Sequence, residues 1–167
     1  WEIAINPEDK FHQSVSDHET WNLLKPWITP KNGTIWRQAA YRFHALLAEK
    51  WISGRVILAG DAAHQQPPFL GQGMCQGIRD SKNLAWKLQA ILNENAPVKL
   101  LQTYEDERKE HVRELTTRIK NIGKLVSERD ISKAIERDKR LRDEVGGVIP
   151  RVPRQDVQPY LKSGLLS

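Results

Sequence analysis

The 167-residue sequence contains a single cysteine and no long run of apolar residues. One cysteine excludes an internal disulfide, which favours a reducing compartment and predicts a cytoplasmic protein. No apolar segment approaches membrane-spanning length and no secretory signal opens the chain, so we expect no membrane association. The first residue is Trp1 rather than Met, which we interpret as the mark of a fragment or a processed piece.

The sequence also lacks the patterns of two other functional classes. No Gly-x-Ser-x-Gly setting occurs, so His64 beside Asp61 does not indicate a hydrolase, and we expect His64 to pack or hydrogen-bond within a loop. The net charge of +5 raises the question of nucleic-acid binding. Acidic residues interleave with the relevant cations and no aromatic side chain lies among them, which favours a solvated helix face and no nucleic-acid partner. These cations are Arg113, Arg118, Lys120, Lys124 and Arg129. The sequence identifies no catalytic residue and no metal site.

The most informative segment begins with a short apolar run, Val56 to Ala59, which lies between glycines. This pattern predicts a strand buried on both faces of an α/β sheet, and ligands bind beyond the carboxyl ends of such strands. Asp61 lies there, and its carboxylate would accept hydrogen bonds from hydroxyl groups but repel a phosphate. A sugar or polyol is therefore the expected partner, and Gly60 would allow its close approach. A helix or turn cap is the alternative role for Asp61.

A proline-containing loop leads from Asp61 to Gly71, Gly73 and a predicted helix from Met74 to Leu92. The first amides of a helix lack partners inside it and carry the positive end of its dipole, so they can hold an electron-rich ligand atom. The Gly-x-Gly string is not a dinucleotide fingerprint, because it does not directly follow its strand. Cys75 fits either a small residue beside a flat ring or a reactive thiol. The predicted buried face of this helix contains Ile78, Ala85, Leu88 and Leu92, with Leu84 and Ile91 beside them.

Together, the stretches GDAAH, PP, GQGMCQGIRD and NLAWKL, with YRFHALLAEKW before them and LLQTYEDERKEH after them, resemble the second flavin-binding motif of FAD-dependent aromatic hydroxylases. The 3-(3-hydroxyphenyl)propionate hydroxylase type is the most similar, and the resemblance covers most of residues 1–127. It implies an α/β fold: a portion of a glutathione-reductase-like FAD-binding fold, with strands of a substrate-side sheet and long C-terminal helices. It also implies a monooxygenase that hydroxylates a phenolic compound with NAD(P)H and O2.

The same resemblance implies roles for individual residues. It places Asp61 at the ribitol chain of FAD, and the backbone amides of Met74 and Cys75 at the pyrimidine end of the flavin ring. Gly60, Gly71 and Gly73 are the other expected cofactor-binding residues. Pro68 resembles the proline on the substrate side of the ring. Many relatives carry Asn at the position of Cys75, so the implied contact there is through the backbone.

Two parts of the hydroxylase pattern are absent from this sequence. It contains no strand followed at once by Gly-x-Gly-x-x-Gly, which would hold the ADP half of FAD, and no thioredoxin-like C-terminal domain. We therefore expect the isolated chain to hold FAD poorly. The alternative interpretation is a truncated, non-catalytic helical interaction module.

We divide the chain into residues 1–45 (the end of the substrate-side sheet with a short helix), 46–127 (the C-terminal part of the FAD-binding domain) and 128–167 (a charged helix and a linker). Strands are predicted at Trp1–Ile5 and Thr34–Phe43, a capped helix from Ser16 to Pro26, and a helical turn or short crossover at Leu46–Trp51.

A second long helix is predicted from Pro97, with an apolar stripe that either packs within the domain or forms a homodimer seam. The stripe consists of Leu101, Tyr104, Arg108, Val112, Leu115, Ile119, Ile122 and Val126. Residues 128–144 should form a solvated helix, and the final segment with Pro150, Pro153 and Pro159 should be extended.

Overall fold

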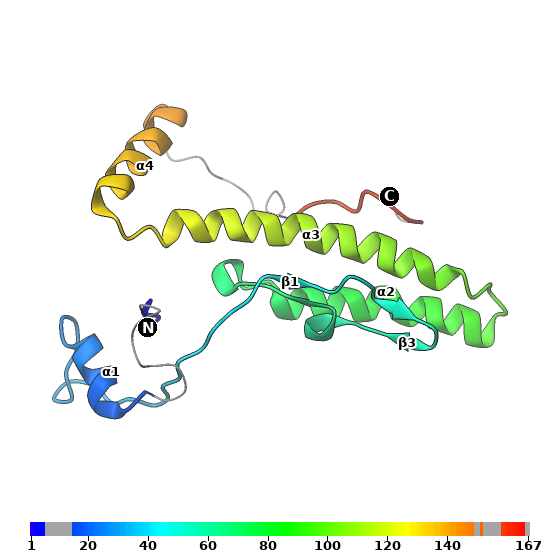
Figure 1. Ribbon diagram of the computed structural model, residues 1–167, viewed down its shortest axis with the longest axis horizontal. Coiled ribbons are helices and arrows are strands. Elements are labelled where there is room, and N and C mark those ends of the chain that lie inside the picture. The colour runs from blue at the N-terminus through cyan, green and yellow to red at the C-terminus, as the bar shows by residue number, and fades with distance from the viewer. Residues whose placement is uncertain (6–14, 149–150, 152–157, 166–167) are drawn as a thin grey trace. The chain divides into compact units, whose positions relative to one another are not determined.

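The computed structural model describes residues 1–5, 15–148, 151 and 158–165. The chain divides into two compact units, Trp1–Arg42 and Phe43–Ser167 (Figure 1). The first unit contains one helix, and the second contains three longer helices and four short strands within the described residues. In this part of the chain, no helix combines the length and apolar character needed to span a bilayer.

The helix of the first unit is α1, Asp17–Leu24. Its start is the predicted capping box: the Glu19 amide donates to Ser16 Oγ at 3.3 Å, and Glu19 Oε2 accepts from the Ser16 amide at 2.8 Å. These bonds satisfy two amides that the helix itself cannot pair. Hydrogen bonds from Ser16 also lower the pKa of Glu19. The helix predicted from Ser16 is therefore confirmed.

The strands predicted at residues 1–5 and 34–43 are absent from the structure, where both segments are irregular. A β-strand needs a neighbouring strand to pair its backbone groups, and the described part of the first unit offers none. The alternating pattern of these residues is thus not sufficient to form a sheet within this chain.

The second unit begins with two pairs of short antiparallel strands. Strand β1, Leu46–Leu47, pairs with β4, His64–Gln65, and β2, Ile52–Ser53, pairs with β3, Val56–Ile57. A turn at Gly54, with φ of +58°, joins β2 to β3. The prediction of a helical turn at Leu46–Trp51 was therefore wrong, because Leu46 and Leu47 pair with the segment after Asp61.

The apolar run Val56 to Ala59 forms only the two-residue β3, and Val56 is 65% exposed. The prediction of a strand buried on both faces was wrong for this chain. An apolar strand is buried on both faces only when other elements cover the sheet, and here β3 pairs with β2 alone.

Two long helices, α2 (Gly73–Asn93) and α3 (Leu100–Val126), lie side by side in this unit (Figure 1). The start of α2 near Gly73 agrees with the prediction. The buried residues of α3 include five of the predicted stripe, Tyr104, Arg108, Val112, Leu115 and Ile119, which confirms packing against the neighbouring helix. Tyr104 and Val112 join Trp51 and Ala63 in the core, and Tyr104 Oη donates to the Leu58 carbonyl oxygen at 2.9 Å.

The buried face of α2 differs from the predicted one. The predicted positions Ile78 and Leu92 are 59% and 76% exposed, whereas the fully or almost fully buried residues are polar: Gln76, Asp80, Asn83 and Lys87. The apolar pattern does not identify this face because α2 meets α3 through hydrogen bonds and ion pairs.

The last helix, α4 (Ile131–Glu144), contains no buried residue, as predicted for residues 128–144. Of the three prolines in the final segment, Pro150 and Pro153 lie outside the described residues, and Pro159 is buried. Residues 158–165 contact α3: Leu165 donates its amide to Glu107, and Lys162 forms an ion pair with Glu114 at 2.7 Å.

Candidate functional site

The predicted ligand-binding loop is the short 3-10 helix η1, Gly60–Ala62. Gly60 has φ of +58°, a conformation that L side chains rarely adopt. A Cβ placed on Gly77 of α2 would lie 3.6 Å from Gly60 Cα, so the two glycine backbones are in direct contact. The loop therefore lies against the second turn of α2.

Asp61 is exposed, and within the described residues its carboxylate has no hydrogen-bond or ion-pair partner. No contact in the structure supports the alternative in which Asp61 caps a helix or turn. A solvent-facing carboxylate in this loop can accept hydrogen bonds from ligand hydroxyl groups.

The start of α2 leaves its first amides available. Its N-cap residue, Gln72, makes no side-chain hydrogen bond to them, whereas Ser16 and Asp130 cap α1 and α4. Apart from its chain neighbours and the adjacent backbone of α2, no described atom lies within 4 Å of a Cβ placed on Gly73, and Met74 is 76% exposed. This helix start can therefore hold an electron-rich atom of a ligand.

A short loop joins the η1 loop to the start of α2 and is anchored to α3. Gln66 Nε2 donates to Thr116 Oγ1 at 2.7 Å, and the Phe69 ring covers Gly123 so closely that an added Cβ would lie 2.3 Å from it. The second 3-10 helix, η2 (Pro68–Leu70), ends at Gly71, where φ is +60°. Pro68 is exposed on this loop, so its ring is free to contact a bound molecule.

A buried carboxylate lies behind the site. Asp80 is fully buried: its Oδ2 accepts from the Gly60 amide at 3.0 Å and from His64 Nε2 at 2.7 Å, and its Oδ1 accepts from Arg108 Nε at 2.7 Å. Burial alone would raise the pKa of Asp80, but hydrogen bonds from His64 and Arg108 and their charges lower it below its usual value. We call Asp80, His64, Arg108 and Gln76 the Asp80 cluster.

His64 and Arg108 have further contacts. The predicted loop role of His64 is confirmed, because it is 2% exposed and packs 5.5 Å from the Trp51 ring as well as bonding Asp80. Arg108 also donates to Gln76 Oε1 at 2.6 Å and lies 3.1 Å from His111 Nδ1. Burial, followed by the Arg108 charge, lowers the pKa of His111 to about 4. His111 is therefore neutral at pH 7, and its Nδ1 can accept from Arg108.

A second buried carboxylate, Glu107, lies on the same pair of helices. It accepts from Asn83 Nδ2 at 2.6 Å, Lys87 Nζ at 2.8 Å and the Leu165 amide at 2.8 Å. We call these residues the Glu107 cluster. Burial would raise the pKa of Glu107, but these hydrogen bonds lower it.

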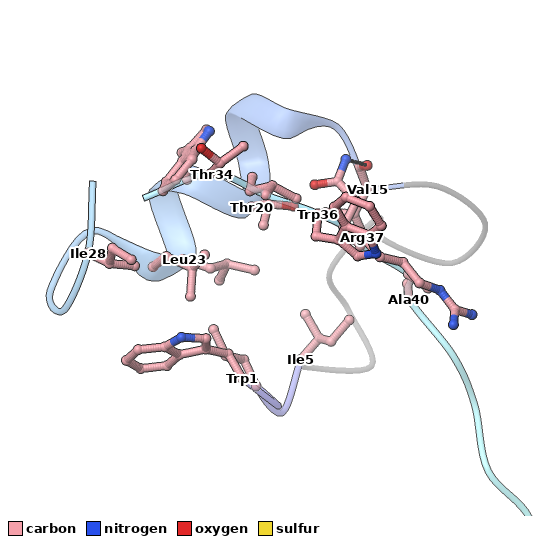
Figure 2. Close-up of a pocket in the computed structure, with 16 residues that line it drawn as sticks. Trp1, Ile5, Val15, Thr20, Leu23, Ile28, Thr34, Trp36, Arg37 and Ala40 are labelled. Carbon is pink, nitrogen blue, oxygen red and sulfur yellow. Dashed lines mark hydrogen bonds between the residues drawn. The ribbon is translucent and has the colours of Figure 1, made fainter. Parts of the chain in front are cut away.

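The first unit contains a separate cavity of about 370 Å³ (Figure 2). Its walls are mainly apolar and come from the N-terminal segment, from α1 and from residues 34–40, with Trp1, Leu23 and Trp36 among the labelled side chains. None of the residues predicted to bind the ligand lies there. In the described part of the chain, no group of three or more His, Cys, Asp or Glu residues could hold a metal ion.

Comparison with known proteins agrees with this geometry. Residues 8–119 match the FAD binding domain family. The chain belongs to the FAD binding domain family. The match covers two thirds of the sequence and includes the η1 loop, the start of α2 and the Asp80 cluster. The family expected from the GDAAH motif is confirmed.

The similar curated proteins are hydroxylases. The chain is 42% identical to the probable NADH-specific resorcinol 4-hydroxylase of Rhodococcus jostii, over 82% of this chain and 25% of that protein. It is 34% identical to the 3-(3-hydroxy-phenyl)propionate/3-hydroxycinnamic acid hydroxylase of Mycolicibacterium smegmatis, over 97% of this chain and 29% of that protein. The chain thus spans between 25% and 29% of the length of these relatives.

Solved structures confirm the fold class. p-Nitrophenol 4-monooxygenase from Pseudomonas putida superposes with a TM-score of 0.66 at 29% identity, covering 79% of this chain and 35% of that protein. A flavin-dependent monooxygenase solved in complex with FAD and substrate matches with a TM-score of 0.61 over 96% of this chain and 35% of that protein, at 22% identity, and supports the fold alone. The chain therefore has part of a monooxygenase FAD-binding fold.

The residues of the site can be compared with what binding of FAD would require. Asp61 offers acceptor oxygens without internal partners, Gly60 has a positive φ and packs directly against Gly77, and α2 begins without a side-chain cap. These features suit the hydroxyl-bearing chain and the electron-rich edge of a flavin. The residues thus fit part of the cofactor. Sequence reasoning missed Asp80, Gln76 and Glu107, whose only signal was polar residues spaced along one face of α2 or α3.

Proposed function

We propose that the whole protein is an FAD-dependent monooxygenase that hydroxylates a phenolic compound with NAD(P)H and O2, and that this chain forms part of its flavin cradle. The observation that carries the proposal is the unpartnered Asp61 carboxylate in a loop packed, through Gly60 and Gly77, against a helix whose start has no side-chain cap. No observation on the described residues favours the alternative of a non-catalytic interaction module.

In this proposal, each part of the cradle has a separate task. Asp61 binds ribitol hydroxyl groups, while Gly60 and Gly71 shape the loops around it. The backbone amides at Gly73, Met74 and Cys75 hold the electron-rich edge of the ring, where oriented donors stabilise negative charge without reorganising. The bound flavin supplies the redox and oxygen-transfer chemistry. Pro68 contacts the substrate side of the ring.

The names of the similar proteins support a phenolic substrate, because the relatives act on resorcinol or on hydroxyphenyl acids by name. One relative is described as NADH-specific, which supports a nicotinamide reductant. The single cysteine supports a cytoplasmic location. A homodimer remains a prediction, and size-exclusion chromatography with light scattering would test it.

The test uses protein expressed from the whole reading frame that encodes this chain. We expect a flavin absorption spectrum, and NAD(P)H oxidation that a phenolic substrate stimulates with formation of a hydroxylated product. A purified, folded protein that never binds FAD would refute the proposal.

A substitution tests the assignment of Asp61. We expect Asp61→Ala to weaken FAD binding by about 1.5 to 3 kcal/mol, or about 10- to 150-fold in Kd, because hydrogen bonds to a charged group are lost. Asp138→Ala is the matched control, since Asp138 is an exposed carboxylate on α4 that pairs with Arg137. Equal FAD affinity in Asp61→Ala and the wild type would reject the assignment.

A further inference from the structure

We propose that Asp80 is a positioning residue that fixes the spacing between the two parts of the flavin cradle. The proposal rests on the proposed function, because it assumes that Asp61 and the start of α2 bind FAD. Asp80 itself is fully buried and does not face a ligand.

One side of the Asp80 carboxylate holds the loop. Its Oδ2 accepts the amide of Gly60, the residue directly before Asp61, at 3.0 Å. The same oxygen accepts from His64, three residues after Asp61, at 2.7 Å. Because both flanks of Asp61 are tied to one atom, its backbone has little freedom to move even though its side chain is exposed.

The other side of the carboxylate reaches the start of α2 through α3. Asp80 Oδ1 binds Arg108 Nε at 2.7 Å, and a second Arg108 nitrogen donates to Gln76 Oε1 at 2.6 Å. Gln76 lies in the first turn of α2, one residue after Cys75. A single carboxylate thus links the Asp61 loop to the turn whose amides would hold the ring.

The charge of Asp80 matters to this link. All three groups that face it are donors, so both of its oxygens must be acceptors. In Asp80→Asn, one acceptor is replaced by a donor of nearly the same shape. The substitution therefore breaks one side of the link and leaves the packing volume almost unchanged.

Glu107→Gln provides a matched control. It makes the corresponding change in the Glu107 cluster, which lies on the same two helices but binds Leu165 instead of the η1 loop. Both variants neutralise a fully buried carboxylate that pairs with a buried cation. A general loss of packing between α2 and α3 would therefore affect both, whereas a positioning role affects only Asp80→Asn.

The experiment uses protein from the whole reading frame and has two readouts: the Kd for FAD, measured by titrating the deflavinated protein, and hydrogen exchange of the Gly60 amide without FAD. We expect Asp80→Asn to raise the Kd by about tenfold or more, the equivalent of one hydrogen bond to a charged group, and to speed exchange at Gly60. In Glu107→Gln, the Kd for FAD and the exchange rate at Gly60 should both stay within about twofold of the wild type, which is clearly smaller than a tenfold change.

If Asp80→Asn does not fold, His64→Phe carries the same test, because it removes one donor to Oδ2 and keeps both the ring beside Trp51 and the Arg108 ion pair. Unchanged Kd and Gly60 exchange in the folded Asp80 or His64 variant, or an equal loss in Glu107→Gln, would overturn the positioning role. If Asp61→Ala also leaves FAD affinity unchanged, the cradle assignment fails as well. If Asp61→Ala weakens binding and Asp80→Asn does not, only the positioning role fails.

Discussion

The Asp80 and Glu107 clusters join the same two helices by the same chemistry but serve different segments. Each centres on a fully buried carboxylate that pairs with a buried cation and accepts one backbone amide. For Asp80 that amide belongs to Gly60 in the η1 loop, and for Glu107 it belongs to Leu165 near the end of the chain. The two clusters are thus alike in burial and charge and differ in the segment that they hold. Only the Asp80 cluster holds a segment that we assign to ligand binding.

This difference shows how a buried ion pair can be interpreted. Removing two charges from water offsets much of their attraction, so such pairs are weak evidence for added stability. Their hydrogen bonds do fix geometry, because each donor has one suitable acceptor. We therefore interpret both clusters as devices that hold a segment in place, and the Asp80 cluster as the one that holds the cradle.

The largest effect is expected when one ion-pair partner is removed. Arg108→Met should lower the free energy of unfolding by about 3 to 5 kcal/mol, because Asp80 is left buried without its cation. Lys87→Met should destabilise the Glu107 cluster by a similar mechanism. Chemical denaturation of protein from the whole reading frame measures both losses, and hydrogen exchange should show faster Gly60 exchange in Arg108→Met alone. Faster Gly60 exchange in Lys87→Met as well would remove the distinction between the clusters.

Acid should weaken both clusters. The pKa values of Asp80 and Glu107 are lowered from 3.8 and 4.5, so the unfolded chain binds protons that the folded chain does not. Their contribution to stability is complete above these unfolded-state values and is lost as the pH falls through the lower folded-state values.

His111 adds a second loss of stability on acidification, and this loss begins at a higher pH than that of the two carboxylates. Its pKa falls from 6.5 to about 4, so stability decreases as the pH is lowered between these values. Denaturation at pH 7, 5.5 and 3.5 measures both effects. In Asp80→Asn, the part of the loss below pH 4 that is due to Asp80 should disappear, whereas an unchanged acid profile would contradict this assignment.

The smallest effect is expected at the surface of α3. Arg113 and Glu110 form an ion pair in which both side chains are about half exposed. Arg113→Ala should change the free energy of unfolding by less than about 1 kcal/mol, because water screens such pairs. It should not change exchange at Gly60. A loss as large as that in Arg108→Met would show that burial does not separate the two classes of ion pair.

Several parts of the fold were predictable because their signals are local. The Ser16-x-x-Glu19 capping box and the start of α2 near Gly73 depend on neighbouring residues, and the structure agrees with both. The strands at residues 1–5 and 34–43 were not predictable in this way, because a strand depends on a partner that may lie far along the sequence. The family, and with it the cofactor, followed from the motif around Asp61 rather than from composition.

The main error of the sequence-based prediction was the face that α2 buries against α3, which is polar. Apolar periodicity assigned Ile78 and Leu92 to the core, although Asp80 and Lys87 are the buried residues. Charged side chains are rarely buried unless they are paired, and the partners here lie 20 or more residues away in the sequence. The separation explains why the helix pattern alone could not reveal them.

The most direct test of the central claim is a crystal structure, with FAD bound, of the protein from the whole reading frame. Our account predicts that the Asp61 carboxylate accepts hydrogen bonds from ribitol hydroxyl groups, while the amides at Met74 and Cys75 face the pyrimidine edge of the ring. A flavin bound with its ribitol chain and ring away from Asp61 and the start of α2 would contradict it.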